Sequence, residues 1–143
     1  MSAVIFLDFD GVIRIPQEAH ISRVGSFKHA VFCKQRMDLL ENLCGDMDAK
    51  IVISSAWRTF KSKDEVFRLL TAKLSARIHG DWATQDFGSR WEEIEYWLEC
   101  NNHSGAFVIL DDQASHFNNS PEGIKTNLVL CEYSEGLTGN SID

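Results

Sequence analysis

The stretch that decides the fold is residues 4–12, which read Val-Ile-Phe-Leu-Asp-Phe-Asp-Gly-Val. An unbroken apolar run ends there at two carboxylates, Asp8 and Asp10, and Gly11 follows. The run is too short for a lone helix and is typical of a strand buried on both faces of a parallel sheet. Gly11 indicates that the chain turns sharply after the strand. The two acids therefore lie where open α/β sheets bind ligands, and a cation or a proton must offset their mutual repulsion.

The acids have a structural alternative, because aspartate also caps helices and turns. A second segment favours a functional role. Residues 50–58, Lys-Ile-Val-Ile-Ser-Ser-Ala-Trp-Arg, contain another β-branched run, and Ser54 directly follows its last apolar residue. A hydroxyl at a strand end, together with backbone N–H groups, can hold a phosphate oxygen. The alternative for Ser54 is a helix N-cap.

A third apolar run, residues 106–110, ends at Asp111 and Asp112. The carboxyl ends of parallel strands meet at one edge of a sheet, so we expect the polar residues after the three runs to converge. They are Asp8, Asp10, Ser54, Asp111 and Asp112. Carboxylate oxygens are the hard ligands that Mg²⁺ prefers. The sequence therefore predicts a magnesium site with a phosphate-binding hydroxyl beside it.

The order of these blocks resembles the haloacid dehalogenase (HAD) superfamily of phosphotransferases. The chain is closer still to the HAD-like domains of multifunctional (Swiss Army Knife) RNA repair proteins. That subgroup is similar to this chain in I-V-I-S-S-A-W-R, R-W-E-E-I-E-Y-W-L and V-I-L-D-D, and in N-L-V-L followed by G-L-T. These blocks run from residue 3 to about residue 138, so the resemblance covers nearly the whole chain.

The resemblance implies an Mg²⁺-dependent phosphoric monoester hydrolase. Asp8 would attack phosphorus and form an aspartyl-phosphate, the covalent strategy that carboxylates use elsewhere. Asp10 would protonate the leaving oxygen and then deprotonate water. Asp8, the Asp10 carbonyl and the pair Asp111 and Asp112 would hold the metal. By the superfamily pattern, Asp112 is the direct ligand and Asp111 supports it.

Three further residues complete the implied site. Ser54 would bond a phosphoryl oxygen. The superfamily expects a lysine or arginine before the helix that precedes the last acidic strand, and Arg90 stands there. Arginine is the less usual choice in the superfamily but fits the subgroup, and the alternative is a solvated surface charge. Arg58 either binds substrate phosphate or pairs with an acid.

Composition is that of one small domain over residues 1–143, with 44% hydrophobic residues for a single core. No apolar stretch has the length of a membrane span, and no basic region precedes the first apolar run as in a signal peptide. The cysteines show no C-x-x-C pairing or zinc spacing, and Cys33 and Cys44 fit a buried helical stripe. We expect a cytoplasmic protein without an obligate protein partner.

The layout of apolar segments predicts an α/β, Rossmann-like domain with a parallel five-stranded sheet. The expected strands cover about 3–8, 50–54, 76–79, 106–110 and 126–131, and residues 80–88 form a loop. The expected helices cover 27–44 with a stop at Gly45, 63–74, and a capping box at 89–92 followed by a helix to about Cys100. Trp91, Ile94, Trp97 and Leu98 of that last helix would pack inward.

Superfamily relatives often carry a cap domain, inserted after the first motif or between the second strand and the third motif. Neither the segment from Asp10 to Ile51 nor the segment from Arg58 to Arg90 has room for one. A capless site is open and suits bulky phosphorylated substrates such as polymer ends or phosphoproteins, although small metabolites stay in play. The subgroup points to a nucleic-acid terminal phosphate. The net charge of −7 argues against indiscriminate nucleic-acid binding but not against an end bound at a locally basic mouth.

Two other classes of function remain as alternatives. A phospho-accepting receiver module also uses carboxylates, a hydroxyl and a cation, but its paired acids usually follow the first strand and its acceptor the third. Here the D-x-D comes first and the Asp-Asp pair comes late. The other alternative is a HAD fold that serves as a non-catalytic regulatory or binding domain. Phosphate release under turnover separates the three classes.

Overall fold

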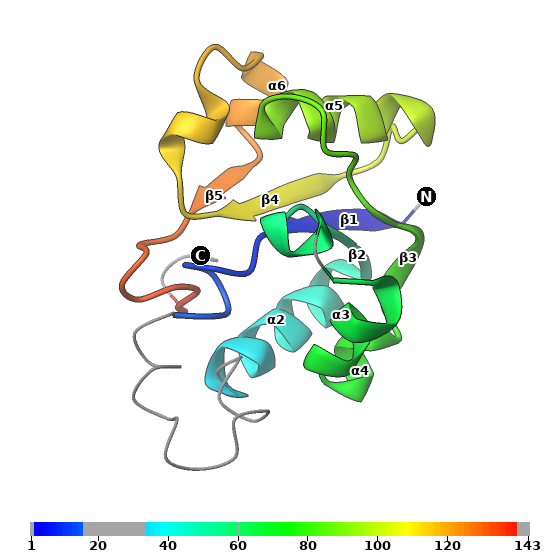
Figure 1. The fold of residues 1–143 in the computed structure, drawn as a ribbon, viewed down its shortest axis with the longest axis vertical. Coiled ribbons are helices and arrows are strands. Elements are labelled where there is room, and N and C mark those ends of the chain that lie inside the picture. Colours follow the sequence, from blue (N-terminus) through cyan, green and yellow to red (C-terminus); the bar gives the residue numbers. More distant parts are fainter. Residues whose placement is uncertain (1, 16–33, 60, 140–143) are drawn as a thin grey trace.

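The computed structural model describes residues 2–15, 34–59 and 61–139. Its centre is a five-stranded sheet in which every pair of neighbouring strands is parallel. Strand β1 (Ala3–Leu7) lies in the middle, with β2 (Ala49–Ile53) and β3 (Ile78–Ala83) on one side and β4 (Phe107–Asp111) and β5 (Leu128–Leu130) on the other (Figure 1). The fold is therefore α/β and Rossmann-like, as the apolar runs predicted.

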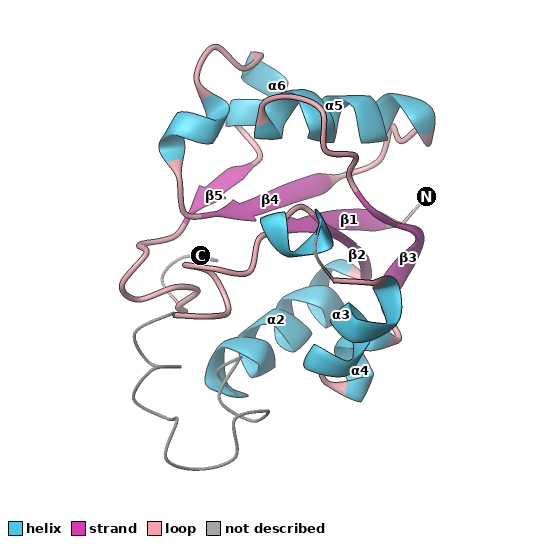
Figure 2. Ribbon diagram, in the orientation of Figure 1, coloured by secondary structure: helices cyan, strands magenta, loops and turns pink. Residues whose placement is uncertain are grey.

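Helices cover both faces of this sheet (Figure 2). One face carries α2 (Lys34–Met47), α3 (Lys63–Leu69) and α4 (Ala72–Ser75), and the other carries α5 (Arg90–Cys100) and α6 (Glu122–Lys125). Two short 3₁₀ helices, η3 (Ala56–Thr59) and η4 (Ala114–Phe117), follow β2 and β4. Both lie just beyond strand ends, where ligands bind in such folds.

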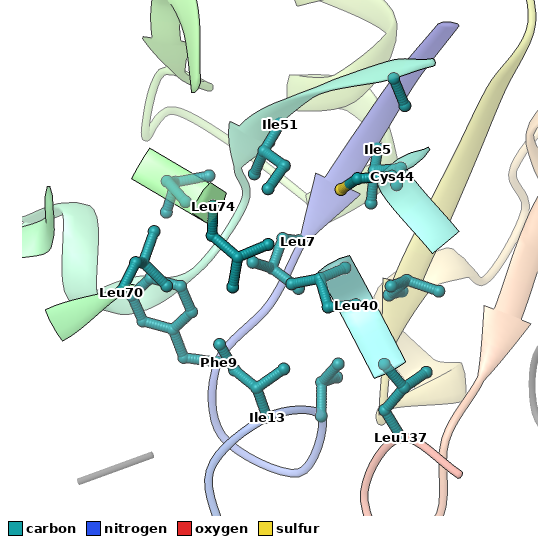
Figure 3. Close-up of a cluster of buried hydrophobic side chains, with 14 of the residues drawn as sticks. Ile5, Leu7, Phe9, Ile13, Leu40, Cys44, Ile51, Leu70, Leu74 and Leu137 are labelled. Carbon is teal, nitrogen blue, oxygen red and sulfur yellow. The ribbon is translucent and has the colours of Figure 1, made fainter. Parts of the chain in front are cut away.

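The core forms two clusters because side chains alternate along each strand. Ile5 and Leu7 of β1 pack toward Leu40 and Leu74 in the larger cluster (Figure 3). The other face of β1 packs on α5, and its cluster contains Val4, Phe6, Val52, Ile94, Trp97, Ile109, Phe117 and Ile124. Trp91 and Leu98 pack against that second cluster, so the predicted inward face of the last long helix is confirmed.

The predicted helix over residues 63–74 is wrong in one respect, because two helices replace it. Helix α3 ends at Leu69, and Leu70 has extended backbone. The Thr71 side chain then accepts from the Leu74 N–H at 3.2 Å and caps α4. A threonine that bonds the backbone ahead of it favours a new helix start over continuation of the old one.

The bounds of other helices and strands also differ from the predicted ones. Gly45 does not end α2, which continues to Met47 and turns at Asp48 with a φ of 49°. Strand β3 extends through Ala83 into the expected loop, because its backbone pairs with β2. Residues 27–33 of the expected first helix, including Cys33, lie outside the described residues. In the part of the chain that is described, no helix has the length and apolarity to cross a membrane.

Candidate active site

The register of the central strands brings their carboxyl ends together. Leu7 of β1 pairs with the last residue of β2 and with Leu110 of β4. The Ser54 N–H donates to the Leu7 carbonyl at 2.8 Å, and the Asp8 N–H donates to the Leu110 carbonyl at 3.0 Å. Asp8, Ser54 and Asp111 are therefore neighbours at one edge of the sheet, as the strand pattern predicted.

Three carboxylates gather at this edge. Asp8, Asp111 and Asp112 each offer an oxygen within 4.8 Å of the others. Asp8 and Asp111 are buried, and Asp112 is half-buried. Backbone donors fix the two buried acids, because the Phe9 N–H donates to Asp8 at 2.9 Å and the Gln113 N–H donates to Asp111 at 3.0 Å.

The electrostatics of this cluster favour a bound cation. Burial, followed by the Asp111 carboxylate, raises the pKa of Asp8 to about 8, and Arg90 acts in the opposite direction. Burial is also the main cause that raises the pKa of Asp112. Without a cation, the cluster therefore holds on to protons that isolated carboxyls lose near pH 4.

Gly11 makes room for Asp112. A Cβ on Gly11 would lie 2.5 Å from Asp112 Oδ2, which no real side chain tolerates. Gly11 also has a φ of 79°, in the left-handed region that other residues rarely adopt. The glycine of the D-F-D-G-V block is therefore needed twice, for the turn and for the close approach of the carboxylate. We call this space beside Gly11, which the Asp112 side chain fills, the Gly11 cradle. It places Asp112 against the backbone that follows the Asp8 strand.

Arg90 reaches the same cluster from the first turn of α5. Its Nη1 donates to Asp111 Oδ2 at 2.7 Å and to the Ser54 carbonyl at 2.5 Å, and it lies 3.7 Å from Asp8 Oδ1. The side chain is only 10% exposed, so Arg90 is not a solvated surface charge. A capping box begins α5, as the sequence predicted, and it fixes the turn that carries this guanidinium.

The Ser54 hydroxyl is buried and has no hydrogen-bond partner among the residues that the structure describes. A buried polar group without a partner costs about 1–3 kcal/mol. The hydroxyl makes no capping bond in that part of the chain, so the N-cap alternative does not account for it. A ligand oxygen at the sheet edge would satisfy it.

The expectation that four carboxylates converge is wrong for Asp10. Its side chain is not part of the acidic cluster of Asp8, Asp111 and Asp112. The chain turns tightly after Phe9, and the Gly11 N–H donates to the Arg14 carbonyl at 2.7 Å. Arg14 Nη1 then bonds Asp10 Oδ1 at 2.6 Å, and Trp57 Nε1 donates to Asp10 Oδ2 at 3.2 Å. These two donors hold the Asp10 carboxylate. Ligation by the Asp10 carbonyl stays a prediction.

Arg58 takes the second of its two alternatives and pairs with an acid. Its Nη2 donates to Glu93 Oε1 at 2.9 Å, and both side chains are buried. Its Nε donates to the Thr84 carbonyl at 2.8 Å, and its Nη1 donates to the Ser55 carbonyl at 2.6 Å. All three nitrogens of the guanidinium thus have protein acceptors. Arg58 also lines the cleft beside Arg90, so phosphate binding by Arg58 stays a prediction.

A cleft of about 310 Å³ opens beside Arg90. Residues of η3, the loop before α5, the first turn of α5 and η4 line it. It includes His116, whose Nδ1 lies 3.5 Å from Asp111 Oδ1. A cavity of about 490 Å³ at the start of β2 contains none of the predicted site residues. Of these two cavities, the smaller one is lined by Arg90 and Arg58, while Asp8, Ser54, Asp111 and Asp112 are not among its lining residues.

The sequence pattern assigned no role to Glu93, Trp57 or His116. The one signal for Trp57 and Glu93 was that they stand in the blocks I-V-I-S-S-A-W-R and R-W-E-E-I-E-Y-W-L.

The comparison with protein families agrees with this geometry. A family model described as the HAD domain in Swiss Army Knife RNA repair proteins matches residues 4–142. Neither a curated protein nor a solved structure matches the chain. Since the match spans nearly the whole length, the chain belongs to the HAD domain family of Swiss Army Knife RNA repair proteins.

Proposed function

We propose that the chain is an Mg²⁺-dependent phosphatase that works through an aspartyl-phosphate on Asp8. One observation carries the proposal. The buried Ser54 hydroxyl, which has no partner among the described residues, lies at the same sheet edge as Asp8 and the Arg90 guanidinium. A hydroxyl donor and a cation beside a carboxylate are the groups that a phosphoryl oxygen and its attacking nucleophile need.

The proposed reaction has two steps. An Asp8 oxygen attacks phosphorus, the bond from phosphorus to the leaving oxygen breaks, and Asp10 gives that oxygen a proton. Water then attacks the aspartyl-phosphate, Asp10 accepts the proton of the water, and the bond from phosphorus to Asp8 breaks to release inorganic phosphate. Ser54 and Arg90 bind phosphoryl oxygens or neutralise their charge in both steps.

The residues present fit a magnesium ion. The three clustered carboxylates supply hard oxygen ligands, and the Gly11 cradle holds Asp112 close to the Asp8 strand. Asp8, Asp112 and the Asp10 carbonyl would hold the ion, with Asp111 in support. When bound, Mg²⁺ supplies the charge neutralisation that attack of a carboxylate on a phosphate anion requires.

Two features support a proposal about the substrate class, namely the lack of a cap domain between β2 and α5 and the family to which the chain belongs. Between β2 and α5 the described chain forms only η3, α3, α4 and β3, which supports a capless site over one domain. We propose that the substrate is a bulky phosphate ester, with a nucleic-acid terminal phosphate first among candidates because the family is named for RNA repair. The cytoplasm is the proposed compartment, and the described cysteines are free thiols.

The test is phosphate release by the purified chain with Mg²⁺. The panel contains 5′- and 3′-phosphorylated oligonucleotides, nucleotides, sugar phosphates and p-nitrophenyl phosphate. We expect multiple turnovers by the wild type, none by Asp8→Asn, and wild-type rates for the matched exposed variant Asp46→Asn. A single phosphate retained per chain would favour the receiver alternative, and no release from any substrate would favour a binding domain.

A further inference from the structure

The Asp10 carboxylate is held by two donors from different parts of the chain. Arg14 Nη1 lies 2.6 Å from Oδ1, and Trp57 Nε1 lies 3.2 Å from Oδ2. Arg14 belongs to the turn after β1, and Trp57 belongs to η3 after β2. Each carboxylate oxygen thus has one protein donor, and each keeps a second lone pair for another partner.

The two donors also support each other. The Arg14 guanidinium carbon lies 5.2 Å from the centre of the Trp57 ring, within the range of a cation–π contact. The Trp57 ring packs edge-to-face on the buried Phe9 ring, with centroids 5.7 Å apart. The Trp57 backbone N–H donates to the Ser55 hydroxyl at 3.2 Å. The donors are therefore anchored in the core and on η3.

We propose that Trp57 and Arg14 are positioning residues that orient the Asp10 carboxylate for proton transfer to the leaving oxygen. This inference rests on the proposed function. The carboxylate is itself 40% exposed at its side chain, so without the two donors it would rotate among several staggered arrangements in solvent. Fixing it in one arrangement raises the fraction of substrate complexes in which an oxygen can transfer its proton.

The role predicts a dependence on the leaving group. An alkoxide needs a proton as its bond to phosphorus breaks, whereas p-nitrophenolate leaves as a stable anion. Loss of Asp10 orientation would therefore slow phosphorylation of Asp8 by an alkyl phosphate and spare phosphorylation by p-nitrophenyl phosphate. The ratio kcat/KM isolates this step, because it reports only the events up to loss of the leaving group.

The experiment compares kcat/KM for the best alkyl phosphate of the panel and for p-nitrophenyl phosphate. Trp57→Phe keeps an aromatic ring against Phe9 and removes the N–H donor together with part of the indole. We expect kcat/KM to fall about tenfold or more with the alkyl phosphate, part of the about 10²–10⁴-fold that a general acid supplies, and less than about threefold with p-nitrophenyl phosphate. Arg14→Met, which keeps an alkyl stem on Trp57, is expected to give the same selective loss.

Trp97→Phe is the matched control. It also loses an indole N–H bond, to the Asp81 carbonyl at 3.0 Å, but its ring lies in the cluster under α5 away from Asp10. We expect it to change kcat/KM by the same factor for both substrates. Equal changes in both substrates for Trp57→Phe and Arg14→Met would overturn the inference while leaving the phosphatase in place. A wild type that hydrolyses neither substrate would overturn both.

Discussion

The Arg58 guanidinium and the Glu93 carboxylate form a buried ion pair of 2.9 Å that joins η3 to α5. Burial lowers the pKa of Arg58, and Glu93 acts in the opposite direction. Glu93 Oε2 also accepts from the Phe87 N–H at 3.0 Å and the Gly88 N–H at 3.2 Å. The pair therefore holds the segment after Ser54, the loop before α5 and the turn that carries Arg90 in one arrangement.

Glu93→Gln is expected to destabilise the fold by about 3 kcal/mol, because it leaves the buried Arg58 charge without its counter-ion. Urea unfolding measures the loss. Glu99→Gln, an exposed position on the same helix, is the control and is expected to stay within about 0.5 kcal/mol of wild type. If the two variants unfold at the same urea concentration, the ion pair does not stabilise this region.

Gly11→Ala is expected to lower both stability and Mg²⁺ affinity. The new Cβ would collide with Asp112 Oδ2 and would force a φ of 79° on an alanine, which costs about 1–2 kcal/mol by itself. Thermal unfolding and Mg²⁺ titration check both effects. Gly45→Ala is the control, since its Cβ meets nothing within 4 Å inside α2, and we expect a gain of about 0.5–1 kcal/mol. If Gly11→Ala were as stable as Gly45→Ala and bound Mg²⁺ as tightly, the close contact between Gly11 and Asp112 would not matter.

The sequence was sufficient for the sheet and for the convergence of Asp8, Ser54 and Asp111. Apolar runs buried on both faces identify parallel strands, and the geometry of such sheets then fixes where their carboxyl ends lie. Arg90 was placed through the family resemblance and not through spacing. Periodicity alone does not show that a charge at the start of a helix points into a buried edge.

What the sequence could not give are the contacts between distant segments. Trp57 bonds a carboxylate 47 positions away, and Arg58 bonds one 35 positions away. Nothing local selects these partners, because tertiary packing brings η3 over the turn after β1. For the same reason the sequence predicted that Asp10 follows the first strand but not where its carboxylate points, because that direction depends on Arg14 and Trp57. Local side-chain competition at Thr71 likewise outweighed the helical pattern of residues 63–74.

The stability of the metal-free chain is expected to fall as the pH rises from about 4 to about 8. Asp8 has a pKa of about 8 in the fold and about 3.8 as an isolated side chain, so the folded state binds more protons in this interval. The free energy of unfolding then decreases with pH and levels off above pH 8 as far as this group is concerned.

Melting temperatures across this pH range in EDTA check the slope. Asp8→Asn, which cannot ionise, is expected to flatten much of the decline and to match or exceed the wild-type melting temperature at pH 8. Asp46→Asn serves as the exposed control and is expected to keep the wild-type slope. A decline of the same size in Asp8→Asn would show that another group causes it.

Mg²⁺ is expected to stabilise the fold through the acidic cluster. A ligand that binds only the folded state adds RT ln(1 + [Mg²⁺]/Kd), about 2.7 kcal/mol at a hundredfold excess over Kd, or roughly 8 °C for a domain of this size. Asp112→Ala is expected to show a much smaller shift, and Asp10→Asn an intermediate one, because the Asp10 carbonyl is retained. Ca²⁺ is expected to stabilise the chain but to support little activity, since its larger and looser shell positions phosphate poorly. Identical Mg²⁺ responses of wild type and Asp112→Ala would mean that the ion binds elsewhere.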